Sequence, residues 1–80
     1  MVEIHYFAAM AEAVGRDRED LDLPADATIA DLCSTLATRY GADIAKRLAV
    51  CAFVVGDELT RDRGTLLSPR VDVLPPFAGG

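Results

Sequence analysis

The chain has 80 residues, which is enough for one domain around a single core but leaves few residues for the walls of a catalytic cleft. Hydrophobic residues make up 51% and charged residues 26%, as in folded domains, so the composition excludes a disordered chain. The net charge is -5, from thirteen acidic against eight basic residues, and no basic run is longer than the pair Lys46-Arg47. Nucleic acid and anionic membranes are therefore not expected as partners, whereas a basic protein surface would suit the chain.

The sequence carries no pattern for a membrane span, a redox pair or a metal site. No apolar stretch approaches the ~20 residues of a spanning helix, and no basic leader follows Met1, so we expect a cytoplasmic protein. Cys33 and Cys51 are too far apart for a CxxC pair and lie in apolar segments, which predicts core thiols without a catalytic role. His5 is the single histidine, so zinc binding is not expected.

The first quarter of the chain predicts a hairpin with a short helix between its strands. Residues 2–7 alternate apolar and polar side chains, residues 8–14 are rich in helix formers and end at Gly15, and residues 19–23 alternate again up to Pro24. In the first strand His5 lies on the face opposite the apolar residues. We expect an exposed or edge imidazole there, not a general base, because no partner is apparent.

Residues 28–40 predict the main helix. Thr28 and Asp31 approximate a capping box, and Gly41 is a C-terminal stop. The apolar positions follow the spacing i, i+3, i+4, i+7 and form one stripe: Ile29, Leu32, Cys33, Leu36, Ala37 and Tyr40. Tyr40, at the end of this stripe, is expected in the core.

The second half of the chain predicts three further strands. The sequence does not decide the secondary structure of residues 42–48, for which another helical turn is one interpretation. The apolar run 49–55 predicts a central strand covered on both faces. Gly56-Asp57 fits a two-residue hairpin into a short strand at 58–60. The charged turn 61–64 is expected to be solvated, and we assign it no chemistry. Residues 71–74 predict the last strand.

The order strand, strand, helix, strand, short strand, strand predicts an α+β fold in which one mixed sheet packs on one main helix. This is the β-grasp arrangement of ubiquitin. We expect the domain to comprise residues 1–74, followed by an extended C-terminal tail at residues 75–80 that ends in Gly-Gly.

The tail contains the strongest functional motif in the sequence. Pro75 and Pro76 fix φ and stiffen the exit from the sheet, while Gly79 and Gly80 have no Cβ, so a narrow channel in a partner enzyme can close around the backbone. A terminal glycine pair arises by chance in roughly one chain in two hundred at average glycine usage. On a β-grasp domain, the pair points to the Gly80 carboxylate as the reactive group.

These residues together resemble the MoaD family, the small subunit of molybdopterin synthase, within the ubiquitin-like sulfur carriers that also include ThiS. The similarity is carried by the opening at residues 4–8, by residues 21–32, and above all by the Pro-Pro-x-x-Gly-Gly ending, which ThiS-like carriers typically lack. Two features depart from the family pattern. Ser68-Pro69-Arg70 replaces a Gly-Asp-Glu turn, and Phe77 stands where Val is common, which leaves the paralogue open.

The resemblance implies that the chain is a non-catalytic carrier that binds no cofactor itself. An E1-like adenylating enzyme would use ATP to adenylate Gly80, and a sulfurtransferase would supply the sulfur that converts it to a thiocarboxylate. A MoaE-like large subunit, in a heterotetramer, would then pass this sulfur to cyclic pyranopterin monophosphate and form the dithiolene of molybdopterin. The partner-binding residues would be those of the tail, with Phe77 as an apolar anchor: Pro75, Pro76, Phe77, Ala78 and Gly79.

Other functions remain open on the sequence alone. A ThiS-like carrier of another sulfur pathway is the nearest alternative, and a ubiquitin-like modifier of lysines would also end in Gly-Gly. An adaptor domain would need no free terminus. A thiol redox enzyme built on Cys33 and Cys51 is the weakest of these hypotheses.

Overall fold

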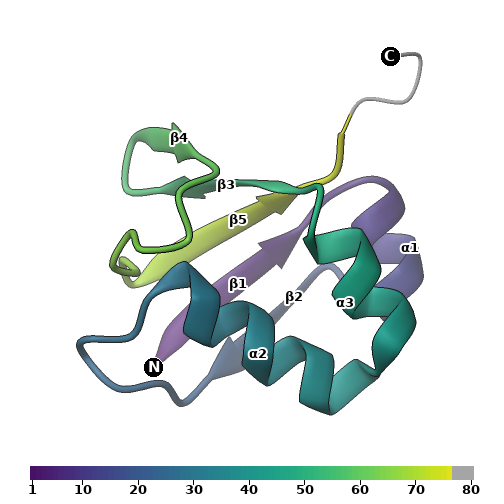
Figure 1. The fold of residues 1–80 in the computed structure, drawn as a ribbon, viewed down its shortest axis with the longest axis horizontal. Helices are drawn as coiled ribbons and strands as arrows, with labels where there is room; N and C mark the ends of the chain where they lie inside the picture. Colours follow the sequence, from purple (N-terminus) through teal and green to yellow (C-terminus); the bar gives the residue numbers. More distant parts are fainter. Residues whose placement is uncertain (77–80) are drawn as a thin grey trace.

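The computed structural model describes residues 1–76 and contains a five-stranded sheet of order β2-β1-β5-β3-β4, with α2 lying across one face (Figure 1). The elements in chain order are β1 Val2–Tyr6, α1 Ala9–Val14, β2 Arg18–Leu21, α2 Ile29–Tyr40, α3 Ala42–Leu48, β3 Ala52–Val55, β4 Glu58–Thr60 and β5 Arg70–Leu74. The predicted α+β arrangement of one mixed sheet on one main helix is confirmed.

The first and last strands form the centre of the sheet. β1 and β5 pair in parallel, with Ile4 opposite Val71, while all other strand pairs are antiparallel. A parallel pair needs a crossover connection, and here the crossover carries the main helix to one face of the sheet. None of the helices among residues 1–76 is long and apolar enough to cross a membrane.

Helix α2 begins and ends as its sequence predicts. The Thr28 backbone N–H donates to Asp31 Oδ2 at 2.8 Å and the Asp31 N–H donates to Thr28 Oγ1 at 3.3 Å, which completes the capping box. The apolar stripe of α2 packs on the inner face of the sheet, and the central side chains of this core are fully buried: Ile4, Ile29, Leu32, Leu36, Phe53, Val71 and Val73.

The segment from residue 42 to residue 55 differs from its prediction. Residues 42–48 form the complete helix α3, and the Cys51 N–H donates to Leu48 O in the turn that follows, so β3 starts only at Ala52. In β3 only Phe53 is buried. β3 is central in the sheet, between β5 and β4, but only one of its faces is turned toward α2. The prediction of a strand covered on both faces is therefore wrong.

Strand β2 covers Arg18–Leu21, one residue earlier than predicted at its start and two shorter at its end. The hairpin between β3 and β4 is confirmed, since Val55 pairs with Glu58 and Gly56 takes φ +63°. A first turn residue with positive φ favours glycine, as this position has.

Candidate functional site

The candidate site is the end of the molecule where the tail leaves the sheet. β5 ends at Leu74, and Pro75 and Pro76 follow at the end of the sheet where α1 and α3 lie (Figure 1). Pro75 is half-buried and Pro76 is exposed. The other predicted site residues lie outside the described residues: Phe77, Ala78, Gly79 and Gly80.

A small apolar cavity lies beside this exit, and we call it the tail-root pocket. Its volume is about 150 Å³, and its lining comes from α1, from α3 with the residues after it, and from the start of the tail: Ala9, Met10, Arg47, Val50, Pro75 and Pro76. Met10 is fully buried, whereas Val50 is 55% exposed. The pocket is therefore an opening in the surface above a core side chain. This pocket was not expected from the sequence, because residues 42–48 had only a helical turn as one interpretation and not the complete helix α3.

A second apolar feature covers part of the sheet face opposite α2, and we call it the outer-face patch. Strand register places Val54 opposite Leu59 and Ala52 opposite Leu74, so these four side chains share one face. Leu59 is 65% exposed. The patch is adjacent to the tail, since Leu74 immediately precedes Pro75. Sequence reasoning missed it, although Leu59 between two polar strand residues was a readable sign.

The other half of the outer face is charged. His5 Nε2 lies 2.8 Å from Glu3 Oε1, and Arg70 Nε donates to Asp72 Oδ1 at 2.9 Å. The hydrogen bond with His5 lowers the pKa of Glu3, and Arg18 and Arg70 act in the same direction. His5 was expected to be exposed or at an edge and to have no partner. That expectation is wrong, because β1 is central and Glu3 is two residues away on the same face.

Glu19 is a buried carboxylate at the centre of a hydrogen-bond network. The hydroxyls of Tyr6 and Tyr40 each donate to Glu19 Oε2 at 2.6 Å, and Arg39 Nη1 donates to Oε1 at 2.7 Å. Burial alone would raise the pKa of Glu19, but the hydrogen bonds from the two tyrosines and the charges of Arg39 and Arg16 together outweigh burial, so the pKa is lowered. The network joins β1, β2 and α2, and its member Tyr6 pairs with Val73 of β5, two residues before Pro75.

Tyr40, expected in the core, is only partly buried and packs against it, with its hydroxyl directed to Glu19. Burial, followed by the hydrogen bond to Glu19, raises its pKa. The ring of Tyr40 therefore packs on the core as predicted. The hydrogen bond of its hydroxyl to Glu19 was not indicated by the apolar spacing along the helix.

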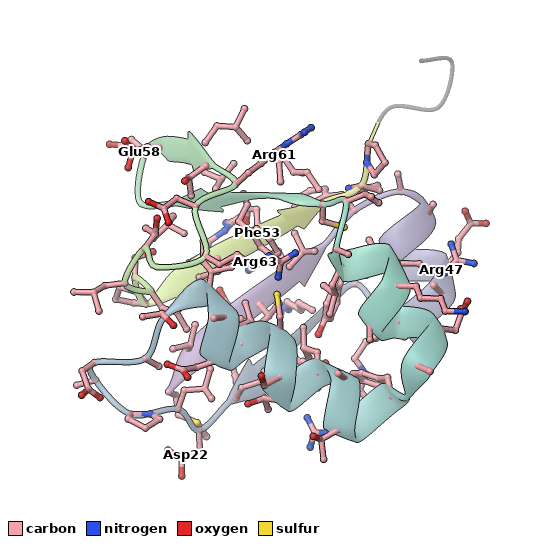
Figure 2. The ribbon with its side chains drawn as sticks, in the orientation of Figure 1. Asp22, Arg47, Phe53, Glu58, Arg61 and Arg63 are labelled. Atoms are coloured by element: carbon pink, nitrogen blue, oxygen red, sulfur yellow. The ribbon has the colours of Figure 1, made fainter. Side chains whose placement is uncertain are left out.

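Arg63 contradicts the expectation of a solvated turn at residues 61–64. Its guanidinium donates to Leu48 O at 2.8 Å and to Cys33 Sγ at 2.7 Å, and it lies 5.9 Å from the centre of the Phe53 ring (Figure 2). Leu48 is the last residue of α3, and carbonyls at the C-terminal end of a helix lack partners within the helix. A cation is therefore favourable beside the Leu48 carbonyl. Arg63 fastens the turn to both helices and has a structural role.

Neither cysteine has the environment of a nucleophile. Cys51 is buried, its Sγ donates to Arg47 O at 3.2 Å, and burial raises its pKa to about 11. Cys33 packs against the core but stays partly exposed, and burial raises its pKa despite the opposing charge of Arg63. A reactive thiol needs a lowered pKa. Among residues 1–76, no three His, Cys, Asp or Glu side chains are grouped to hold a metal ion.

The chain matches the ThiS family over residues 4–80, which includes the whole tail. It belongs to the ThiS family. A molybdopterin synthase sulfur carrier subunit from Emericella nidulans is 30% identical over 89 residues, covering 98% of this ThiS-family chain and 96% of that protein. The sequence-based recognition of a sulfur-carrier family is confirmed.

Two solved structures share the fold of this ThiS-family chain. SAMP1 from Haloferax volcanii has a TM-score of 0.76 and 20% identity, with 99% of this chain and 98% of that chain covered. A putative molybdopterin converting factor, subunit 1, from Pyrococcus furiosus has a TM-score of 0.76 and 23% identity, with 95% and 97% covered. The β-grasp fold is thereby confirmed.

Proposed function

We propose that the chain is the sulfur carrier subunit of a molybdopterin synthase and that the Gly80 carboxylate carries the sulfur. The main support is the relative from Emericella nidulans, which bears that name and aligns with this chain over nearly its whole length. The chemistry of residues 1–76 agrees with a carrier of this kind, because the pKa values of both thiols are raised and the buried carboxylate Glu19 is fully engaged.

The carboxylate needs activation before it can accept sulfur, because it is a stable anion and a poor electrophile. In the proposed cycle, an E1-like adenylating enzyme transfers AMP from ATP to the Gly80 carboxylate and releases pyrophosphate. A sulfurtransferase then delivers sulfur at the sulfide level, which attacks the activated carbonyl; the C–O bond to AMP breaks, AMP leaves, and the terminus becomes a thiocarboxylate. The thiocarboxylate is a polarizable nucleophile that donates its sulfur in the large subunit, where cyclic pyranopterin monophosphate gains the dithiolene of molybdopterin.

The MoaE-like large subunit would contact two neighbouring surfaces of the carrier. Residues 75–79 would enter its channel, with Phe77 as an apolar anchor, and the outer-face patch beside the tail would pack against its surface. Leu59, the exposed leucine of this apolar patch, is a good candidate for a contact residue in the interface. The acid–base groups would belong to the large subunit, and we propose a heterotetramer.

A carrier for another sulfur pathway is the second candidate, since the family match is to ThiS. A protein modifier would use the same activated terminus but would form isopeptide bonds. The two alternatives differ from the proposed function in the acceptor of the activated Gly80, not in its activation.

The test compares three proteins: the intact chain, a chain lacking Gly80, and a chain with one alanine appended after Gly80. Each is incubated with the adenylating enzyme, ATP and a sulfur donor, and its terminal peptide is weighed by mass spectrometry. We expect only the intact chain to exchange one oxygen for sulfur and to support molybdopterin synthesis. A one-residue change displaces the reacting atom by about 3.5 Å, which is beyond the tolerance for attack.

All three proteins should have the same free energy of unfolding if the tail contributes nothing to the core. Molybdopterin synthesis by the untrimmed, extended chain would contradict the proposed function. Loading of the intact chain with sulfur, but without molybdopterin formation in the presence of the large subunit, would instead support a carrier of another pathway.

A further inference from the structure

We propose that the free edge of strand β2 is a docking site for an extended, basic segment of a partner protein, which joins the sheet as an additional strand. β2 is an edge strand and pairs only with β1. At the other edge of the sheet, β4 has three residues and belongs to the outer-face patch, which is already assigned to the large subunit. The edge of β2 has no such assignment.

The hydrogen bonds of β1 show which way the backbone groups of the neighbouring strands face. The Glu3 N–H donates to Pro69 O at 2.8 Å, on the side of β5, whereas the Tyr6 N–H donates to Asp17 O at 2.8 Å, on the side of β2. Backbone groups alternate in direction along a strand. The even-numbered residues of β1 therefore form the hydrogen bonds with β2.

Two residues of β2 turn their backbone groups away from the sheet. Ile4 of β1 lies opposite Glu19, so the backbone of Glu19 faces β1 and the N–H and C=O groups of Arg18 and Asp20 face outward. Within residues 1–76, no backbone group bonds to these two donors and two acceptors. An extended peptide can bind such an edge through its own main chain.

A groove lies beside this edge, on the helix side of the sheet. Its volume is about 630 Å³, and its lining comes from the end of β2 and from α2: Leu21, Asp22, Ser34, Thr35, Thr38 and Arg39. A strand placed about 4.8 Å beyond β2 would turn alternate side chains into this groove, toward the hydroxyl groups of α2. Thr35 Oγ1 donates to Asp31 O at 2.9 Å, so its lone pairs remain to accept. Short hydroxyl side chains on the added strand suit this wall.

The outer face of the same edge favours a basic partner. Asp20 lies directly opposite Glu3 in a pair without mutual hydrogen bonds, where Cα atoms are about 4.5 Å apart and like charges are destabilising. Glu3 contacts His5 and Arg18, whereas no cation among residues 1–76 forms an ion pair with Asp20. Asp22 follows at this edge and points away from the domain (Figure 2). A lysine or arginine opposite Asp20 would supply the missing cation.

A second copy of β2 is a poorer occupant. When two copies pair about a two-fold axis with their outer faces on the same side, every register sets like charges opposite each other: Arg18 on Arg18, Glu19 on Glu19, or Asp20 on Asp20 or Asp22. A basic segment of another protein avoids this repulsion.

Docking at β2 leaves the tail uncovered. β1 separates β2 from β5, and β2 is antiparallel to β1 whereas β5 is parallel to it, so Leu21 and Pro75 lie at opposite ends of the sheet. One partner can therefore hold the protein by β2 while another acts on the tail. This consequence, unlike the docking itself, rests on the proposed carrier function.

NMR titration of the full chain with an octapeptide of alternating threonine and lysine tests the proposal. In an antiparallel pair with lysine opposite Asp20, the backbone groups of the lysines face β2 and those of the threonines face solvent. At saturation we expect amide exchange of Arg18 and Asp20 to slow by at least about tenfold. Exchange at Glu19 and Leu21, whose amides face β1, should change little. Unchanged exchange at Arg18 and Asp20 would overturn the proposal.

Two modified peptides of equal charge distinguish strand addition from general attraction between charges. N-methylation of the lysines removes the donors that face β2 and should weaken binding by at least about tenfold. N-methylation of the threonines is the matched control and should leave the affinity unchanged, because those N–H groups face solvent. Equal affinities for all three peptides would count against an added strand.

Charge reversals at the two edges locate the site. Asp20→Lys should weaken peptide binding by about fivefold. Glu58→Lys, on β4 (Figure 2), changes the net charge equally and should weaken it by less than about twofold, because a distant exposed charge is screened. Both side chains are exposed, so neither reversal should unfold the domain.

An equal loss of affinity in both reversals would place the site elsewhere, and a free protein that is already dimeric through protected Arg18 and Asp20 amides would assign the edge to a second copy. Removal of Gly80 separates this proposal from the carrier function. It should prevent sulfur loading but leave peptide binding unchanged, whereas Asp20→Lys should weaken peptide binding and still accept sulfur.

Discussion

At the scale of single residues, Glu19 shows how one polar side chain can organise an apolar interface. It occupies the inner face of β2, in line with Leu21, and is 7% exposed. A buried carboxylate is tolerated only where donors replace water, and here two tyrosine hydroxyls and an arginine do so. The alternation at residues 19–23 puts Glu19 on the same face as Leu21, which is the core side. It could not indicate the hydrogen-bond donors to Glu19, because these lie on β1 and α2.

We predict that Glu19→Gln lowers the free energy of unfolding by roughly 2 kcal/mol at pH 7, because charge-assisted hydrogen bonds become neutral ones. The pKa of Glu19 is lowered from its ordinary value of 4.5, so below that pH the unfolded chain binds more protons than the folded one. The contribution of the carboxylate is thus present above pH 4.5 and is lost as the pH falls through the folded-state pKa. The difference in free energy of unfolding between wild type and Glu19→Gln should therefore narrow as the pH is lowered below 4.5.

Urea unfolding at pH 7 and pH 3 measures this gap. Asp20→Asn is the matched control, since Asp20 is the next residue along β2 but is exposed, and its substitution should change stability by less than about 0.5 kcal/mol. A gap for Glu19→Gln that is equal at both pH values would contradict the assigned role of the ionised carboxylate.

At the scale of elements, the junction between β1 and α1 holds an unusual backbone. Ala8 has φ 50° and ψ −127°, and it is the non-glycine residue with positive φ among residues 1–76. Alanine is strained in this region, whereas glycine enters it readily. The junction sets where α1 starts, and α1 contributes Ala9 and Met10 to the tail-root pocket.

We predict that Ala8→Gly raises the free energy of unfolding by about 1 kcal/mol, because relief of strain exceeds the added entropy of the unfolded chain. Ala11→Gly is the control within α1, where glycine should instead destabilise by about 1 kcal/mol. Urea unfolding of both variants provides the comparison. Destabilisation by both substitutions would show that Ala8 is not strained.

The elements that the sequence predicted well are those with local determinants. Helix α2 has its capping residues, its apolar stripe and its terminal glycine within one segment, so its bounds could be predicted from the sequence. The boundary between α3 and β3 could not be predicted, because apolar residues of the helix and of the strand follow one another there and hydrophobicity alone does not separate them. Arg63 could not be predicted from its turn, since its partners Leu48 and Cys33 are distant in sequence.

At the scale of the whole molecule, the apolar side chains near the tail are unevenly distributed. The outer-face patch adjoins the exit of β5, while the charged half of the same face lies on β1, β2 and the start of β5. The fold could be predicted from the sequence because the order of the elements allows few topologies. The tail motif could be predicted because its residues are contiguous in the sequence. It did not lead to the outer-face patch, which depends on strand register.

We predict that Leu59→Asp weakens binding to the large subunit by at least about tenfold without unfolding the domain, because an exposed side chain is lost from the proposed interface. Leu66→Asp is the matched control, with a leucine that is 59% exposed outside the outer-face patch. Calorimetric titration of both variants measures the difference. Equal affinities for the two would remove the patch from the interface.

The position of β5 in the sheet also determines how the domain bears load. A partner that draws the tail into a channel pulls on β5 along its own axis. β5 is hydrogen-bonded to β1 on one side and to β3 on the other, so the bonds of both ladders resist this force together, in shear. A tail continuing from an edge strand such as β2 or β4 would have one ladder to resist the same pull. The tail thus continues from a strand that is held on both sides, and a pull along the tail would load two ladders of hydrogen bonds at once.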